Sequence, residues 1–337
     1  MSKPILLLVC IWLSGAFVSP VGSPYALKYP TKWPKPTYDF SKNPTTVEGV
    51  ALGRKLFYDP ILSRDSSISC SHCHLSYTAF AHVDHALSHG IADRVGKRNA
   101  PAMMNLAWSR HFMWDGAVNH LDVQALAPIT HPAEMDDQIG NVVKKLQATP
   151  HYPALFEAAF GDRKITGEKV LKSIAQFELT LISAGSKYDR VQAGVDSFTA
   201  QEKNGYRLFQ LHCNQCHTEP LFTNGAFENN GLPIDTALND KGRSVISQDA
   251  ADDFKFKVPT LRNIEFSYPY MHDGRFKKLK EVLRHYTEGV QVSPTLSGSL
   301  RNKITLNDRE KVDLTAFLLT LTDKEFLFNP AFSFPKE

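Results

Sequence analysis

Two short segments carry the residues best suited to chemistry. Cys70-Ser71-His72-Cys73-His74 and Cys213-Asn214-Gln215-Cys216-His217 both read C-x-x-C-H. Two thiols at this spacing can form thioether bonds to the two vinyl groups of one porphyrin, and the imidazole that follows can bind the iron. The pattern therefore predicts two covalently bound c-type haems, with His74 and His217 as proximal iron ligands. The attachment points are then Cys70, Cys73, Cys213 and Cys216.

Two other uses of cysteine pairs explain the pattern less well. A thioredoxin-like dithiol needs only C-x-x-C and gives no reason for a histidine after both copies. A zinc site that joined both pairs around one ion would need ligands much further apart in sequence than those of zinc fingers. Covalent haem accounts for both histidines and for four of the five cysteines.

The fifth cysteine, Cys10, lies in a segment typical of a secretory signal. A short cationic start is followed by the apolar run Ile5 to Leu13 and by the small residues Ser14-Gly15-Ala16. We predict a signal peptide within residues 1–23, with cleavage between 16 and 23. Cleavage after Ala16 is preferred to cleavage after Ser23, and a lipid anchor on Cys10 is the less favoured alternative. The apolar run is too short for a permanent membrane span, and the prediction is an exported, periplasmic protein in which Cys10 is removed.

Length and composition limit the remaining possibilities. The chain has 337 residues, of which 42% are hydrophobic and 22% are charged, which is typical of globular proteins. Its length is typical of two domains. The formal net charge of +3 is too small for a nucleic-acid-binding surface, so no nucleic acid is expected as a partner.

Helix signals precede both cysteine motifs. Thr46 can cap a helix whose apolar stripe runs from Val47 to Phe57, and Thr199 with Glu202 forms a capping box before a helix that leads to Cys213. Between these, Thr166 opens another apolar helix. No segment shows convincing strand alternation. We therefore expect a mostly α protein, built from two cytochrome c-like haem domains with long loops and weak internal repetition.

The domain boundaries follow from the breaks in these patterns. The Pro-rich segment 24–36 is predicted to wrap around the molecule, and the polar, Gly-containing segment 184–197 is the best hinge. This predicts an N-terminal haem domain over 24–185 and a C-terminal haem domain over 186–337. The C-terminal tail is expected to pack back on the first domain.

Further motifs surround the two cysteine motifs. They are Leu52 to Pro60 (LGRKLFYDP), Lys97 to Pro101 (KRNAP), Trp114 to Gly116 (WDG), Pro132 to Met135 (PAEM), Val258 to Asn263 (VPTLRN) and His272 to Gly274 (HDG). In this order, from about residue 46 to 320, the chain resembles the bacterial di-haem cytochrome c peroxidases and their MauG-like relatives. The resemblance implies an oxidoreductase that reduces hydrogen peroxide to water with electrons from a small redox protein such as cytochrome c.

The resemblance also implies roles for individual residues. The His74 haem would bind peroxide and the His217 haem would transfer electrons. Glu134, in the P-x-E-M stretch, matches the glutamate that lies over the peroxide-binding iron. Such a carboxyl group can accept the first peroxide proton and return it to the leaving oxygen. From the residues alone, the favoured interpretation of Glu134 is a solvated carboxylate beside Asp136 and Asp137.

Three further positions match the family pattern around this haem. Gln124 matches a distal amide that orients peroxide or water, and Pro128 matches a residue that shapes the pocket. Trp114 matches an indole between the two haems, where an aromatic ring can carry electrons. Its alternative is a core aromatic with a satisfied N–H.

Several ligands remain open. The resemblance places an axial methionine of the electron-transfer haem where this chain has Tyr286, as in the MauG-like branch; the alternatives are His285, Met271 or water. His89 is a candidate displaceable distal ligand of the other haem, or an incidental residue.

A calcium site is implied at Asn99 with the backbone carbonyls of Ser267 and Pro269. Other histidines are predicted to face solvent or to be hydrogen-bonded; they are His82, His85, His111, His120 and His131.

Two other functions stay open. A MauG-like maturase would oxidise tyrosine or tryptophan side chains of a partner protein, and Tyr286 favours it. A simple electron carrier would not react with peroxide, and the acid and amide pair of Glu134 and Gln124 argues against it.

Overall fold

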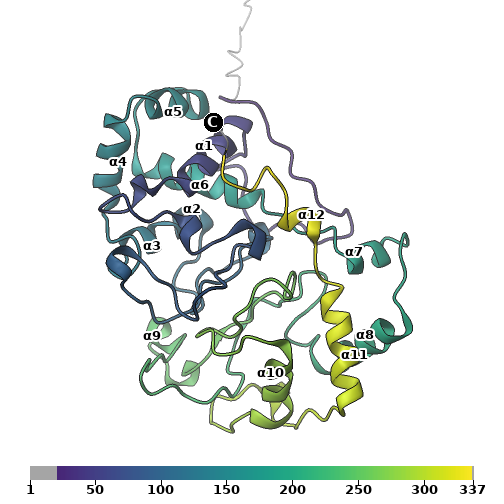
Figure 1. Ribbon diagram of the computed structural model, residues 1–337. Helices are drawn as coiled ribbons and strands as arrows, with labels where there is room; N and C mark the ends of the chain where they lie inside the picture. The colour runs from purple at the N-terminus through teal and green to yellow at the C-terminus, as the bar shows by residue number, and fades with distance from the viewer. Residues whose placement is uncertain (1–20, 336–337) are drawn as a thin grey trace, which may run out of the picture.

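The computed structural model describes residues 21–335 and is mostly helical (Figure 1). All but the last three residues of the predicted signal segment lie outside that range. The α-helices are α1 (Val47–Tyr58), α2 (Leu121–Gln124), α3 (Leu126–Thr130), α4 (Ile139–Ala148), α5 (Tyr152–Phe160), α6 (Gly167–Leu179), α7 (Lys187–Gln192), α8 (Ala200–His212), α9 (Ser244–Ser247), α10 (Leu279–Arg284), α11 (Asp308–Leu319) and α12 (Lys324–Leu327). Strands β1 (Phe227–Glu228) and β2 (Phe256–Lys257) form an antiparallel pair.

Short helical turns fill the long loops. The 3-10 turns are η1 (Pro60–Leu62), η2 (Cys70–His72), η3 (Ser76–Thr78), η4 (Ile91–Asp93), η5 (Leu106–Trp108), η6 (Ala250–Asp252) and η8 (Gly298–Leu300), and η7 (His285–Gly289) is a π-helical turn. Within residues 21–335 no helix combines the length and hydropathy needed to cross a bilayer.

The helices begin where their caps predict. The side chains of Thr46 and Thr166 accept hydrogen bonds from the first turns of α1 and α6. Thr199 and Glu202 form the capping box of α8. These caps satisfy backbone N–H groups that have no partner inside the helix. The three predicted helix starts are confirmed.

Two helix pairs form the framework, because α1 packs on α6 and α8 packs on α11. Both pairs meet at a glycine. A Cβ added to Gly53 of α1 would lie 1.8 Å from the carbonyl oxygen of Ser173, and one added to Gly205 of α8 would lie 1.9 Å from that of Asp313. Only glycine permits these backbone contacts.

The end of the chain returns to the first helix pair. Phe326 and Phe332 join Phe57 and Phe177 in one buried cluster, and the Tyr58 hydroxyl donates to the Phe332 carbonyl at 2.6 Å. In Figure 1 the yellow C-terminal segment crosses back beside α1. Residues after α11 therefore stabilise the N-terminal half.

The loops repeat as well as the helices. Phe112 pairs with Val118 across a tight turn, and Tyr270 pairs with Phe276 in the same way. Asn105 and Asn263 both have φ of 56°. The backbone N–H of Asn105 donates to the Leu181 carbonyl, and that of Asn263 donates to the Leu321 carbonyl. The weak repetition in the sequence thus corresponds to one backbone pattern used twice.

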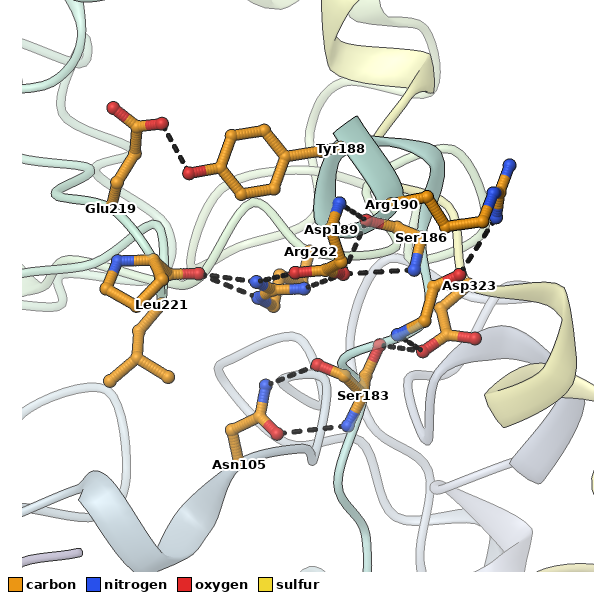
Figure 2. Close-up of polar contacts among 12 residues, drawn as sticks. Asn105, Ser183, Ser186, Tyr188, Asp189, Arg190, Glu219, Leu221, Arg262 and Asp323 are labelled. Carbon is orange, nitrogen blue, oxygen red and sulfur yellow. Dashed lines mark hydrogen bonds and ion pairs between the residues drawn. The ribbon is translucent and has the colours of Figure 1, made fainter. Parts of the chain in front are cut away.

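The segment proposed as a hinge is held by a buried polar network (Figure 2). The segment contains α7. Just before it in the chain, the Ser183 hydroxyl donates to Asp323 at 3.0 Å. The guanidinium group of Arg262, which is 0% exposed, pairs with both carboxylate oxygens of Asp189 at 2.8 Å and donates to the Pro220 carbonyl. These contacts join α7 to residues of the C-terminal half.

Candidate functional site

Both C-x-x-C-H segments fold into the same turn. The amide of His74 donates to the Cys70 carbonyl at 3.0 Å, and the amide of His217 donates to the Cys213 carbonyl at 2.9 Å. The first turn is η2, and the second follows directly on α8. In both places the thiols and the imidazole lie on one short turn, as attachment to a single porphyrin requires.

Each motif histidine is oriented through its Nδ1 atom. Nδ1 of His74 lies 2.6 Å from the Phe80 carbonyl oxygen, and Nδ1 of His217 lies 3.1 Å from that of Pro259. Because a carbonyl can only accept, Nδ1 carries the proton and Nε2 keeps its lone pair for a metal. Burial lowers the pKa of both imidazoles to about 4, so they are neutral at pH 7, which is the form that binds iron.

A large cavity lies beside the second motif. Its volume is about 660 Å³, within the range of about 300 to 1,000 Å³ usual for small-molecule sites. Cys213, Cys216 and His217 line it from the C-terminal half, and Trp108 and Trp114 line it from the N-terminal half. The residues present therefore fit a haem held on this turn and contacted by both halves of the chain.

The wall of this cavity carries two of the three candidate axial side chains. Tyr286 and Met271 line it. The Met271 sulfur accepts a hydrogen bond from the Asn230 amide at 3.4 Å, and the His285 ring instead contacts the Asn230 carbonyl through Nε2 at 3.1 Å. Burial raises the pKa of Tyr286 to about 12. The phenol is therefore neutral unless a metal ion takes the place of its proton.

Glu134 lies next to the first motif. Burial raises the pKa of the Cys73 thiol, and the Glu134 carboxylate adds to the effect. Burial also raises the pKa of Glu134 itself, opposed by His131, whose Nδ1 lies 3.6 Å away. Its acidic neighbours differ, because Asp136 pairs with Arg64 at 2.7 Å and Asp137 pairs with Lys145 at 2.8 Å. Glu134, whose side chain is 29% exposed, is thus the carboxyl group of this loop that has no Lys or Arg as a partner.

Gln124, the last residue of α2, contacts the loop that precedes this helix, and Trp114 belongs to that loop. The Gln124 amide lies 3.6 Å from the sulfur of Met113, and Met113 lines the cavity beside Trp114. The indole N–H of Trp114 donates to the Asn99 carbonyl at 2.9 Å. Trp114 therefore has a satisfied N–H, as the core-aromatic alternative expects, and it also lies on the cavity wall.

The three predicted calcium ligands line the same cavity. Asn99, Ser267 and Pro269 belong to its wall. The Asn99 backbone amide donates to the His272 carbonyl at 2.7 Å and its side-chain amide donates to the Ala86 carbonyl at 3.0 Å. Within residues 21–335 no cluster of three or more His, Cys, Asp or Glu side chains has the geometry of a metal site. A calcium site here stays a prediction.

The histidines of the first half are arranged differently from the prediction. His89 contacts Asp93 through Nδ1 at 2.8 Å, and its ring lies 4.3 Å from that of His85. His82 and His111 were expected to face solvent or to be hydrogen-bonded, yet each has a buried Nδ1 atom with no hydrogen-bond partner in the described part of the chain. That expectation is wrong for His82, which is buried, whereas the His111 side chain is half-buried.

Comparison with known proteins places the chain in a family. The family described as di-haem cytochrome c peroxidase matches residues 47–197. The methylamine utilization protein MauG of Methylorubrum extorquens is 38% identical over 88% of this chain and 84% of its own length. This chain belongs to the di-haem cytochrome c peroxidase and MauG family. The cytochrome c551 peroxidase of Nitrosomonas europaea, in the same family, is 33% identical over 87% of the chain and 84% of its own length.

Solved structures agree with this assignment. A MauG-like protein associated with microbial copper homeostasis superimposes with a TM-score of 0.84 and 31% identity, covering 92% of this chain and 99% of the other. The di-haem peroxidase BthA of Burkholderia thailandensis shares the fold, with a TM-score of 0.74, 20% identity and coverage of 95% and 97%. Membership of this family implies an oxidoreductase with two c-type haems.

Sequence reasoning missed three buried charged groups in this family member. They are Lys257 on the cavity wall, Glu178 inside α6 and Arg262 at the junction of the halves. Glu178 carried a usable signal, since it interrupts the apolar run Phe177 to Leu179. Lys257 carried none, because nothing in the sequence distinguishes it from a surface lysine, and Arg262 was indicated only as part of the family motif Val258 to Asn263.

Proposed function

We propose that this protein is an exported, periplasmic di-haem enzyme that reduces hydrogen peroxide to water with two electrons from a small redox protein such as cytochrome c. The peroxide site is assigned to residues 24–185, around His74, and the electron-transfer site to residues 186–337, around His217. The observation that carries the proposal is the position of Glu134, which has no Lys or Arg partner. Its backbone carbonyl accepts from the Ile91 amide at 2.7 Å, in the loop whose His89 carbonyl lies 3.5 Å from the Cys73 sulfur. An electron carrier has no use for a group that is poised to move protons.

The reaction consumes two protons and two electrons for each peroxide and releases two waters. Haem iron, when bound, supplies the coordination position for peroxide and the means to accept electrons singly. Glu134 then takes the first proton from peroxide and returns it to the departing oxygen, so that water leaves instead of hydroxide. The raised pKa of Glu134 brings proton release closer to neutral pH, where both transfers are efficient. Gln124 orients the peroxide through its amide.

Trp114 is assigned to electron passage between the two sites. Its indole lines the cavity beside His217, and its N–H is held by the Asn99 carbonyl of the N-terminal half. This hydrogen bond holds the ring in place, so its distance to each cofactor stays constant. Asn99, Ser267 and Pro269 are proposed to bind calcium next to it, which would fix this part of the wall further.

Tyr286 supports a second candidate function. If its phenolate binds iron on the cavity side opposite His217, the C-terminal haem has a low reduction potential and is a poor acceptor from high-potential cytochromes. The enzyme would then oxidise tyrosine or tryptophan side chains of a partner protein, as a MauG-like maturase. The 38% identity to a protein named for methylamine utilization favours the same alternative.

The role of Glu134 is tested by rapid mixing of the holoenzyme with peroxide. In Glu134→Gln the Soret change is expected to be slower by about a hundredfold or more, the usual contribution of acid–base catalysis. Asp136→Asn is the matched control, because Asp136 lies in the same loop but pairs with Arg64 and Arg94. Equal rates for wild type and Glu134→Gln exclude Glu134 from the mechanism.

The two candidate functions are separated by electron source. Steady consumption of peroxide with reduced small cytochromes supports the peroxidase. Absence of that turnover, together with peroxide-dependent oxidation of a protein partner, supports the maturase. Two six-coordinate haems that do not respond to peroxide would reject both.

A further inference from the structure

One part of the cavity wall is cationic. Lys257 of β2 lines the cavity together with Arg110 and His111. The backbone amide of Lys257 donates to the Trp114 carbonyl at 2.7 Å, and its Nζ donates to the His111 carbonyl at 3.0 Å. These contacts fix the ammonium group at the place where the two halves of the chain meet.

This ammonium group has no counter-ion in the described part of the chain. None of the ion pairs there involves Lys257, whereas Lys255, two residues earlier, pairs with Asp252 at 3.1 Å. Burial lowers the pKa of His111, and the positive charges of Arg243 and Lys257 lower it further. The charges around the ammonium group are therefore also positive. Burial lowers the pKa of Lys257 to about 8. A buried ammonium group whose hydrogen-bond partner is only the neutral His111 carbonyl costs free energy, so a bound anion is expected to accompany it.

His111 points to the same anion. Its Nδ1 is buried and has no hydrogen-bond partner among residues 21–335, while its ring lies 5.5 Å from that of Phe227. An oxygen atom placed in the cavity near Lys257 would give both side chains a hydrogen-bond partner. The pair therefore forms a site for a carboxylate, since that group can accept from two donors at once.

The cofactor assigned to this cavity carries such carboxylates. The two propionates of haem lie on the edge opposite the vinyl groups that bond to cysteine. Cys216 lies against Ser299 at 3.7 Å, whereas Lys257 lies against His111 and Trp114 on another wall. We propose that Lys257, with His111, binds a propionate of the C-terminal haem and that its positive charge raises the reduction potential of that haem. This rests on the proposed haem attachment at Cys213 and Cys216.

The consequence concerns electron flow. A cation beside the propionate cancels a negative charge close to the iron and favours the reduced state. It thus opposes the low potential that a tyrosinate ligand would impose. Lys257 is a positioning residue in this scheme, since it acts through the propionate and does not touch peroxide.

The test uses holoenzyme with both haems attached, counted first as pyridine haemochromogen. In Lys257→Met the equilibrium between reduced and oxidised C-terminal haem is expected to shift about tenfold toward oxidised, or about 59 mV in spectroelectrochemical titration. Lys257→Arg keeps the charge and is expected to keep the wild-type potential. Lys255→Met, which removes a neighbouring charge that is paired with Asp252, is expected to leave it unchanged.

Each other outcome overturns the proposal. An unchanged potential in Lys257→Met with two haems attached removes the charge effect. An equal shift in Lys257→Arg shows that packing and not charge is responsible. If Lys257→Met carries fewer than two haems, Lys257→Gln, which is neutral and of similar length, takes its place with the same expectations. Fewer than two haems in the wild type instead overturns the proposed function.

Discussion

Replacement of Glu178 by leucine is expected to stabilise the protein in a strongly pH-dependent manner. Glu178 lies inside α6, is 2% exposed and has a carboxyl oxygen without a hydrogen-bond partner in the described residues. Burial raises its pKa from 4.5 to about 8. In α11 of the second helix pair the corresponding residue is Leu318, which follows Phe317 as Glu178 follows Phe177. The fold therefore accepts leucine at this place.

The magnitude follows from the pKa difference. The folded carboxyl group holds its proton up to a higher pH than the unfolded one, so the free energy of unfolding falls as pH rises from 4.5 to about 8. Each pH unit contributes about 1.36 kcal/mol. The loss in wild type is then about 3 kcal/mol at pH 7 and about 5 kcal/mol above pH 8. Glu178→Leu removes this loss and gains little at pH 5.

Thermal unfolding of the holoenzyme at pH 5, 6, 7 and 8 measures the effect. The difference in melting temperature between Glu178→Leu and wild type is expected to grow with pH. Glu178→Gln, which keeps the shape without the charge, is expected to follow the same trend. Leu318→Glu is the mirror control and should lose stability with rising pH. A difference that does not change between pH 5 and pH 8 would refute the assignment of a buried, protonated carboxyl group.

Four further changes test the framework and the cavity. Gly205→Ala should destabilise the protein by about 3 kcal/mol or more in thermal unfolding, since the added Cβ would lie 1.9 Å from a backbone oxygen. Gly140→Ala, whose Cβ meets nothing within 4 Å in α4, should instead stabilise it by about 0.5 to 1 kcal/mol in the same assay. Arg262→Met should cost about 3 to 5 kcal/mol in denaturant unfolding, because it leaves the Asp189 carboxylate buried without its partner. Tyr286→Phe should change the ferric EPR spectrum of the C-terminal haem, and an identical spectrum rejects ligation by Tyr286.

The sequence was most informative where the chemistry is local. The haem turns depend on five consecutive residues, and the helix starts depend on caps such as Thr46 and Thr199 that act within one turn. Both could therefore be predicted without a fold. From the residues alone a solvated carboxylate is the favoured interpretation of Glu134, and the family motifs reverse that preference. In the structure its ion pairs separate it from Asp136 and Asp137, because both aspartates pair with Arg or Lys, whereas Glu134 lies beside His131.

Long-range contacts account for what was missed. The polar groups of the predicted hinge 184–197 are satisfied by Asp323 and Arg262, which lie far from it in the chain, and no sequence pattern indicates these contacts. Lys257 reads as a surface lysine until β2 places it on the cavity wall. His82 and His111 look polar in sequence, yet each has a buried Nδ1 atom. None of these partners is close in the chain, so no local pattern announces them.

The duplicated frame explains how one chain can hold two different centres. The segments around Asn105 and Asn263 share their turn geometry and their contacts to the following helix, so the two halves can be compared position by position. The differences gather where side chains face the cofactor sites. Gln124 corresponds to Val282, Pro128 to Tyr286, Trp114 to His272 and Glu178 to Leu318.

These few differences agree with the different roles proposed for the two haem sites. The first half has an amide at position 124 and no ligating side chain at position 128, which agrees with the proposed peroxide site. The second half has a phenol at position 286 that can close its iron, together with an apolar neighbour at 282. Removing the phenol and introducing the amide tests the argument directly: Tyr286→Phe combined with Val282→Gln should open the second haem to cyanide, followed by its Soret shift. A second haem that stays closed to cyanide would show that features outside these positions set the difference.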